Sequence, residues 1–152
     1  MTMRREYPDR PFVGVGVVLW RGPDLLLIRR GRAPRLGAWS LPGGRQKLGE
    51  TVRETAIREV MEETGLTVRV TDLIDVVDSL THDAEGRVQY HYTLVDFTAE
   101  WLAGDAVAGT DAADLCWTAP DDLDRFDLWD ETLRIIRLSA AQRPEDGDVG
   151  RR

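Results

Sequence analysis

The chain has 152 residues, which is enough for one domain with a hydrophobic core but short for two. Its formal net charge of −7 argues against a nucleic-acid surface, because such a surface needs clustered lysines and arginines to neutralise phosphates. A small phosphorylated ligand remains compatible with this charge, since a bound divalent cation can supply positive charge locally.

The first half of the chain begins with a predicted β-hairpin. Residues 12–20 are apolar and rich in valine, as expected of a strand, and residues 25–30 predict the returning strand. Gly14 and Gly16 form only a G-x-G pattern with no helix after it, which argues against a dinucleotide-binding fingerprint. We interpret them as positions where another backbone or a ligand comes close.

A glycine-rich bend at residues 39–44 precedes a helix that we predict over residues 50–64. Gly65 is well placed to end this helix. The apolar residues that we expect on its buried side are Val52, Ala56, Ile57, Val60 and Met61.

The second half alternates strands with loops and ends in another helix. We predict strands at 66–77, 88–99 and 115–118, a turn at 83–86, a loop at 103–113, a polar turn at 119–122 and a helix at 128–141. Residues 1–143 form one predicted domain, and residues 144–152, rich in Pro, Gly and charge, are expected to be a disordered tail. Two helices among recurring hairpins predict an α+β fold with a mixed sheet.

The compartment follows from what the chain does not contain. The first ten residues carry no apolar segment of a secretory signal, and the longest apolar stretch is far below the ~20 residues of a membrane span. The single cysteine, Cys116, cannot form an intramolecular disulfide, and we interpret it as a buried structural thiol. We expect a cytoplasmic protein without a membrane partner.

Three glutamates on the predicted helix carry the main chemical signal. Glu59, Glu62 and Glu63 stand at i, i+3 and i+4, which places their carboxylates within an arc of roughly 100°. Each like-charged pair at such spacing costs a few tenths of a kcal/mol. A hard divalent cation would explain the cluster, because magnesium prefers carboxylate oxygens. A solvated acidic helix face is the alternative that these three residues alone leave open.

The residues around these glutamates resemble a known motif. Residues 44–66 are similar to the Nudix box, G-x5-E-x7-R-E-U-x-E-E-x-G-U, in which U is a bulky apolar residue. Its nine defined positions are met by Gly44, Glu50, Arg58, Glu59, Val60, Glu62, Glu63, Gly65 and Leu66. The resemblance to MutT-like Nudix hydrolases covers nearly the whole chain. It implies an α/β/α sandwich with a mixed β-sheet, in which the box forms a loop–helix–loop.

The resemblance also implies roles for individual residues. Glu59 and Glu63 resemble the principal ligands of Mg²⁺ or Mn²⁺, with Glu62 as a further ligand or catalytic helper. The carbonyl of Gly43 matches a backbone ligand of some members. Arg58, together with Glu50, resembles the residues that hold the loop and orient the glutamates. The implied chemistry is attack of a water molecule on one phosphorus of a diphosphate.

Three residues outside the box are further candidates for the site. Arg30 resembles a family position that touches substrate, and Arg29 is its neighbour at the strand end. Simple solvation at the surface is the alternative for both. Asp111 lies in a loop where some members place an acid near the metals, so it is a candidate general base or extra ligand. A turn-forming role is equally compatible with its sequence context.

The box does not identify the group attached to the diphosphate. Residues 27–32, 39–45 and 76–99 resemble a small subgroup described as ADP-ribose pyrophosphatases, which implies cleavage of ADP-ribose to AMP and ribose 5-phosphate. A nucleoside triphosphate pyrophosphohydrolase and a non-catalytic ligand-binding module are the alternatives. The partner implied is a small nucleotide, and a homodimer is compatible because dimers are frequent in the family.

Overall fold

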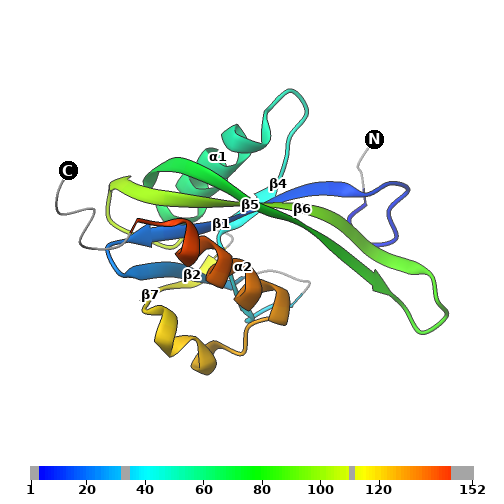
Figure 1. Ribbon diagram of the computed structural model, residues 1–152. Coiled ribbons are helices and arrows are strands. Elements are labelled where there is room, and N and C mark those ends of the chain that lie inside the picture. The colour runs from blue at the N-terminus through cyan, green and yellow to red at the C-terminus, as the bar shows by residue number, and fades with distance from the viewer. Residues whose placement is uncertain (1–3, 32–34, 110–111, 145–152) are drawn as a thin grey trace.

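The computed structural model describes residues 4–31, 35–109 and 112–144. A seven-stranded sheet lies between two helices, α1 (Val52–Thr64) and α2 (Asp130–Gln142), as Figure 1 shows. Each helix packs on its own face of the sheet through a separate apolar cluster. This arrangement confirms the predicted α+β fold and its α/β/α layers. No helix among the residues described is long and apolar enough to cross a membrane.

The sheet is organised around β1 (Phe12–Arg21). This strand runs parallel to β6 (Val88–Ala103) along one edge. Its other edge is shared by two antiparallel strands, β2 (Asp24–Arg30) at one end and β4 (Gly43–Arg45) at the other. The remaining strands are β3 (Trp39–Ser40) and β7 (Ala112–Thr118), which both pair with β2, and β5 (Thr67–His82), which pairs with β6. The sheet is therefore mixed, as predicted.

The apolar run of β1 is continuous because both of its faces are covered. Val15, Val17 and Leu19 belong to the core beneath α1, and Val18 and Trp20 belong to the core beneath α2. The indole N–H of Trp20 donates to the hydroxyl of Ser139 on α2 at 2.9 Å, which fixes that helix over the strand.

The glycines of β1 lie where neighbouring side chains cross the strand. A Cβ on Gly14 would lie 2.8 Å from the side chain of Leu94, and one on Gly16 would lie 2.2 Å from the carboxylate of Asp96. Both neighbours come from β6. The expectation that another backbone or a ligand approaches these glycines is therefore wrong, because the groups that fill the space are side chains of the neighbouring strand.

Several element boundaries differ from the sequence prediction. Strands β5 and β6 are longer than predicted, and they extend as a two-stranded hairpin beyond the body of the sheet (Figure 1). Short strands β3 and β4 lie within the predicted glycine-rich bend. The predicted polar turn at 119–122 opens a 3₁₀ helix, η1 (Pro120–Phe126). These elements depend on pairing and packing with distant residues, which local periodicity does not report.

The buried face of α1 also differs. Ile57 and Met61 are 44% and 45% exposed, so their expected burial is wrong. Thr55 and Glu63 are buried in addition to Ala56 and Val60. The buried side differs from the apolar prediction because three polar side chains, those of Thr55, Glu63 and Thr64, face inward and make specific hydrogen bonds. Cys116 is partly rather than fully buried, since it packs at the margin of the core beneath α2.

Candidate active site

Capping interactions at both ends fix the extent of α1. The hydroxyl of Thr51 accepts from the amide of Glu54 at 3.1 Å, and the carboxylate of Glu54 accepts from the amide of Thr51 at 3.0 Å. This reciprocal pair is a capping box. At the other end Gly65 adopts φ of 75°, and its amide donates to the carbonyl of Met61. The predicted stop at Gly65 is confirmed.

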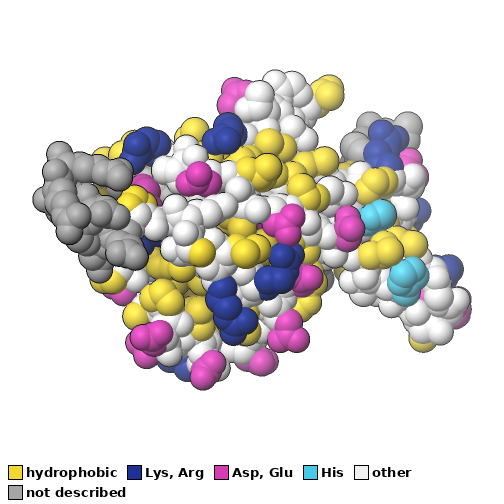
Figure 2. Space-filling view, in the orientation of Figure 1, with side chains coloured by type: hydrophobic (Ala, Val, Ile, Leu, Met, Phe, Trp, Pro, Cys, Tyr) yellow, Lys and Arg dark blue, Asp and Glu magenta, His cyan; other side chains and the backbone are white. Residues whose placement is uncertain are grey.

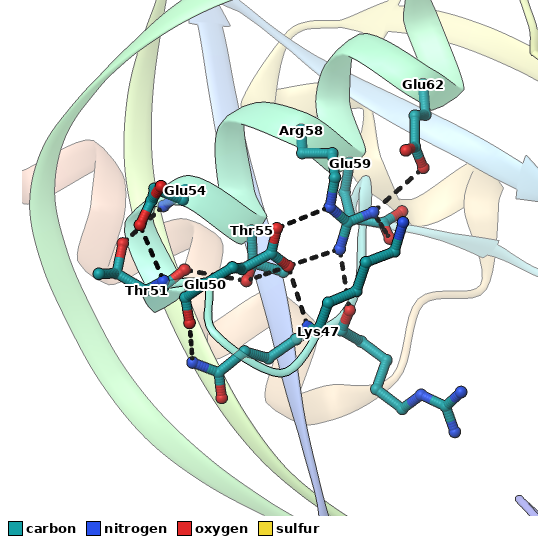
Figure 3. A network of polar contacts seen from close by, with 10 residues as sticks. Lys47, Glu50, Thr51, Glu54, Thr55, Arg58, Glu59 and Glu62 are labelled. Carbon is teal, nitrogen blue, oxygen red and sulfur yellow. Dashed lines mark hydrogen bonds and ion pairs between the residues drawn. The ribbon is translucent and has the colours of Figure 1, made fainter. Parts of the chain in front are cut away.

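Arg58 lies at the centre of the acidic cluster. Its guanidinium donates to both oxygens of Glu50, at 2.8 Å from Nε and 2.7 Å from Nη2 (Figure 3). Nη1 donates to Glu59 at 2.7 Å and to Glu62 at 3.2 Å. Nη2 also donates to the main-chain carbonyl of Arg45 at 3.0 Å. One side chain thus joins the loop after β4 to three carboxylates.

Glu50 is the anchor of this loop. Besides Arg58, its carboxylate accepts from the amide of Lys47 at 3.0 Å and from the hydroxyl of Thr55 at 2.8 Å. These donors, with Arg58 the strongest, lower the pKa of Glu50 from 4.5 to about 2. The carboxylates in turn raise the pKa of Arg58. The loop therefore presents a fixed backbone to the glutamates of α1.

The two glycines before this loop form a cradle for carboxylates. The amide of Gly43 donates to the carboxylate of Glu63 at 2.7 Å. A Cβ on Gly44 would lie 2.3 to 2.6 Å from the carboxylate atoms of Glu59. A Cβ on Gly43 would lie 1.9 Å from the carbonyl oxygen of Val15. Glycine at residue 44 lets the Glu59 carboxylate approach the main chain, and glycine at residue 43 lets β4 lie close against β1.

The cradle fits a hard divalent cation. Glu63 brings an anionic oxygen against Gly43 and Glu59 brings its carboxylate against Gly44, and magnesium and manganese prefer such oxygen ligands. Glu62 is 53% exposed and lies further out, bound to Arg58. Within the described residues, no three acidic, histidine or cysteine side chains already converge as a metal site. Binding would therefore draw in Glu62 or the main-chain carbonyl of Gly43.

Nitrogen ligands are remote from this cradle. The two histidines belong to β5 and β6, and Figure 2 shows them in cyan on the protruding hairpin. The apolar core beneath α1 contains Phe97 and Ala99, which lie towards the opposite end of β6. The ligands near α1 are thus oxygens, which favours magnesium or manganese over metals that prefer imidazole.

The two candidate arginines differ in their surroundings. Arg29 is exposed and its guanidinium lies 6.0 Å from the ring centre of Trp39. Arg30 is half-buried, and burial lowers its pKa, with Arg35 adding to that effect and Glu63 opposing it. Arg30 therefore belongs to the electrostatic environment of the glutamates, whereas Arg29 packs beside an aromatic ring. The pairing of β2 with β7 shifts register between these two residues.

Asp111 lies outside the residues that the structure describes, so its role stays a prediction. Lys47 and Thr55 belong to the loop network and were missed from the sequence. The S/T-x-x-E pattern at Thr51 and Glu54 could have located the start of α1, and with it the inward side of Thr55.

A buried carboxyl lies on the opposite face of the sheet. Asp96 on β6 is 5% exposed, and burial raises its pKa to about 6. The charge of Asp75 adds to this rise, and Arg134 opposes it. Sequence reasoning missed this residue, because its burial depends on the pairing of β6 with β1.

Comparison with known proteins agrees with this geometry. The NUDIX domain matches residues 10–138. The chain belongs to the Nudix family. It is 37% identical over 102 residues to an ADP-ribose pyrophosphatase of Methanocaldococcus jannaschii, covering 67% of this chain and 58% of that protein. This chain thus spans less than two thirds of that relative.

Two further similar proteins have names other than ADP-ribose pyrophosphatase. A putative 8-oxo-dGTP diphosphatase of Bacillus subtilis is 33% identical over 111 residues, covering 72% of this chain and 67% of that protein. The crystal structure of a MutT Nudix hydrolase from Burkholderia pseudomallei has a TM-score of 0.73 and 32% identity, covering 86% of this chain and 98% of that one. The predicted MutT-like membership is confirmed.

Proposed function

We propose that this Nudix domain hydrolyses the diphosphate bond of a nucleoside diphosphate linked to a second group, with Mg²⁺ or Mn²⁺ as cofactor. Glu59 and Glu63 would be the principal ligands, and either Glu62 or the carbonyl of Gly43 would complete the set. The observation that carries the proposal is the approach of Glu63 and Glu59 to the Gly43–Gly44 backbone, with Arg58 holding the surrounding acids.

Other side chains of this protein have separate roles in the proposed reaction. When bound, the cation polarises phosphoryl oxygens and helps ionise water. Arg58 is a positioning residue. Its side chain is only 20% exposed, and its hydrogen bonds hold Glu59 and the loop in place. Glu62 or Asp111 accepts the proton of the attacking water. The water oxygen bonds to phosphorus as the bridging P–O bond breaks, and the electron pair leaves with the departing phosphate.

ADP-ribose is the substrate that we favour, with AMP and ribose 5-phosphate as products. The 37% identical archaeal relative bears the name of this activity. Arg30, half-buried near Glu63, is suited to bind a phosphate oxygen by a charge-assisted hydrogen bond. Arg29 is more exposed and would contribute less. The net charge of −7 suits a small nucleotide whose phosphates are held by metal, and argues against nucleic acid.

A nucleoside triphosphate is the second candidate substrate. The Bacillus subtilis relative, at 33% identity, is named for hydrolysis of an oxidised nucleoside triphosphate. The same carboxylates would then activate a different phosphoanhydride, and the products would be a monophosphate and pyrophosphate. The same carboxylates would act in both reactions, so the identity of the products distinguishes the two candidate substrates.

The test is an assay with ADP-ribose and a panel of nucleoside triphosphates, each with Mg²⁺, with Mn²⁺ and with EDTA. Chromatography of the products should reveal AMP and ribose 5-phosphate only when metal is present. If a nucleoside triphosphate were cleaved with a far higher kcat/KM than ADP-ribose, the proposed substrate would be wrong, and the proposed hydrolysis of a phosphoanhydride would stand. Binding of ADP-ribose without any product under all conditions would identify a non-catalytic module. Homodimer formation and a cytoplasmic location stay predictions.

A further inference from the structure

Residues 104–109, which we call the crossing loop, pass over the C-terminal end of α1. The amide of Val107 donates to the carbonyl of Thr64 at 2.9 Å, and the amide of Gly109 donates to the carbonyl of Glu63 at 2.8 Å. Glu63 and Thr64 are the last two residues of α1, so their carbonyls have no hydrogen-bond partner within the helix. The crossing loop therefore supplies the donors for the turn of α1 that carries Glu63.

The crossing loop is held to the sheet on both sides of α1. At its start, the carbonyl of Gly104 accepts from the indole N–H of Trp101 on β6 at 3.0 Å. Ala106 packs against the core beneath α1. After the loop, Ala112 of β7 pairs with Arg30 of β2. Because both flanking strands belong to the sheet, the loop connects the last turn of α1 to the sheet.

Gly109 makes the closest approach of the crossing loop to α1. A Cβ on Gly109 would lie 2.2 Å from the carbonyl oxygen of Glu62 and 3.3 Å from the Cα of Glu63. Gly109 does not have a positive φ, so its need for glycine is steric. The obstructing atoms belong to the backbone of a helix and cannot rotate away, unlike a side chain. A larger residue at position 109 must therefore move either the loop or the last turn of α1.

Glu63 is held at both its backbone and its side chain. Its carbonyl accepts from Gly109, and its carboxylate, in a residue that is 7% exposed, accepts from the amide of Gly43 at 2.7 Å. Relieving a contact of 2.2 Å takes a shift of about 1 Å, since carbon and oxygen atoms in contact lie more than about 3 Å apart. A displacement of this size is enough to break the hydrogen bond to Gly43.

We propose that Gly109 is a positioning residue for Glu63. By letting the crossing loop dock on the last turn of α1, it keeps the Glu63 carboxylate on the amide of Gly43 and so in place for a divalent cation. The inference rests on the proposed function where it concerns the cation. The placement of Glu63 against Gly43 belongs to the protein without metal and can be measured there.

The experiment compares Gly109→Ala with the unaltered protein by NMR without metal and by calorimetric titration with Mg²⁺. Hydrogen exchange of the Gly43 amide should become about 10-fold faster or more, because the charge-assisted hydrogen bond to Glu63 is lost. The Kd of Mg²⁺ should rise by about 10- to 100-fold, as is typical when a group that orients a metal ligand is removed.

The matched control is Gly104→Ala, the same change in the same loop. Gly104 has a φ of 99°, and a Cβ there would lie 2.8 Å from the carbonyl oxygen of Gly65, so the change also strains the loop at the end of α1. Its neighbours, Gly65 and Leu66, lie beyond the glutamates. Gly104→Ala should lower the thermal unfolding midpoint, but Gly43 amide exchange and the Kd of Mg²⁺ should stay within about 2-fold of the unaltered protein.

If Gly109→Ala did not fold, hydrogen exchange of the unaltered protein at low urea concentrations would carry the test. Opening of the crossing loop exposes the amide of Gly109, and by the inference it also frees Glu63 from Gly43. The amides of Gly43 and Gly109 should therefore show the same free energy of opening. Unequal values would overturn the inference.

Failure of the inference is distinguishable from failure of the proposed function. Unchanged exchange of the Gly43 amide in Gly109→Ala, an equal change in Gly104→Ala, or an unchanged Kd for Mg²⁺ despite faster exchange would each overturn the inference and leave the proposed function standing. If the unaltered protein bound neither Mg²⁺ nor Mn²⁺ while Gly109→Ala alone exposed the Gly43 amide, the proposed function would be wrong and the positioning of Glu63 by Gly109 would stand.

Discussion

Gly44 and Glu59 share one space, since a side chain at residue 44 would overlap the carboxylate of Glu59. Gly44 does not have a positive φ, so its need for glycine is steric rather than conformational. The neighbour is the far end of a flexible side chain, which can move away. An alanine at residue 44 should therefore displace the carboxylate without unfolding the protein.

Gly44→Ala should lower Mg²⁺ affinity and kcat by about 10- to 100-fold, the range typical of changes that misplace a ligand. Thermal unfolding should change little. The matched control is the same substitution in a Glu59→Ala background, where there is no carboxylate to displace. If Gly44→Ala weakened metal binding equally in both backgrounds, its effect would not act through Glu59.

Glu63→Gln tests the metal assignment at the buried end of the cradle. Glutamine keeps an oxygen that can accept from the amide of Gly43, but it removes the anionic ligand. We expect kcat with Mg²⁺ to fall by more than the ~10- to 100-fold typical of residues that only position a ligand. The free energy of unfolding without metal should hold or rise slightly, because like-charge repulsion on α1 is reduced.

The control for Glu63→Gln is Glu54→Gln on the same helix. Glu54 is exposed and serves the capping box, a role that glutamine can also fill. Steady-state kinetics and Mg²⁺ titration of both variants make the comparison. Near-normal turnover in Glu63→Gln would remove that residue from the ligand set.

Arg58→Met should change both activity and the pH dependence of stability. The pKa of Glu50 is lowered to about 2 in the folded protein, so its ion pair stabilises the fold above pH 4.5 and is lost as pH falls from 4.5 toward 2. The variant lacks the part of this contribution that comes from Arg58, the largest cause, while Lys47 and Thr55 still bind the carboxylate. The difference in unfolding free energy between the two proteins should therefore become smaller as pH falls from 4.5 toward 2.

Urea unfolding at several pH values measures that difference, and kcat should fall at least about 10-fold because Glu59 and the loop lose their anchor. Arg53→Met, on the same helix, is the control for removal of a positive charge. A stability difference that stayed constant down to pH 2 would show that Arg58 does not act through Glu50.

The sequence predicted those parts of the site that are local to one helix. Glu59, Glu62 and Glu63 could be placed on one arc because helical spacing alone determines it. The contact between Gly43 and Glu63 joins residues 20 apart in sequence, and no periodicity reports it. The burial of Glu63 was missed for the same reason, because an apolar pattern assigns the inward positions to hydrophobic residues only.

In the rest of the fold, local features were likewise predicted and contacts between distant residues were not. The hairpin of β1 and β2 and the stop at Gly65 follow from local signals, and both were predicted correctly. The parallel pairing of β1 with β6 brings Gly16 beside Asp96, which are 80 residues apart, and only the assembled sheet creates that contact. The extension of β5 and β6 beyond the sheet likewise depends on their mutual pairing.

Glu62→Gln and Asp111→Asn together identify the general base. Glu62 is 53% exposed and is available to a water at the cradle, whereas Asp111 is placed only by its resemblance to a family position. Loss of the base should lower kcat by about 100-fold or more with little change in KM, and should flatten the acidic limb of the pH–rate profile. If a variant leaves both kcat and the pH–rate profile unchanged, the residue it replaces is not the general base.

Asp96→Asn should abolish a pH-dependent loss of stability. The pKa of Asp96 is raised from 3.8 to about 6 by burial and by Asp75, with a smaller contribution from Glu131, while Arg134 and the backbone of Gly16 oppose the rise. The neutral carboxyl is favoured in the folded protein, so this stabilisation is complete below pH 3.8 and lost as pH rises through about 6.

Asparagine is neutral at every pH and cannot show that loss. The unfolding free energy of Asp96→Asn, relative to the unaltered protein, should therefore increase by at most about 3 kcal/mol between pH 4 and pH 7, the equivalent of the shift in pKa. Urea unfolding across this range is the measurement, with Asp72→Asn, an exposed position on β5, as control. A relative stability independent of pH would mean that Asp96 titrates at its ordinary value and is reached by water in solution.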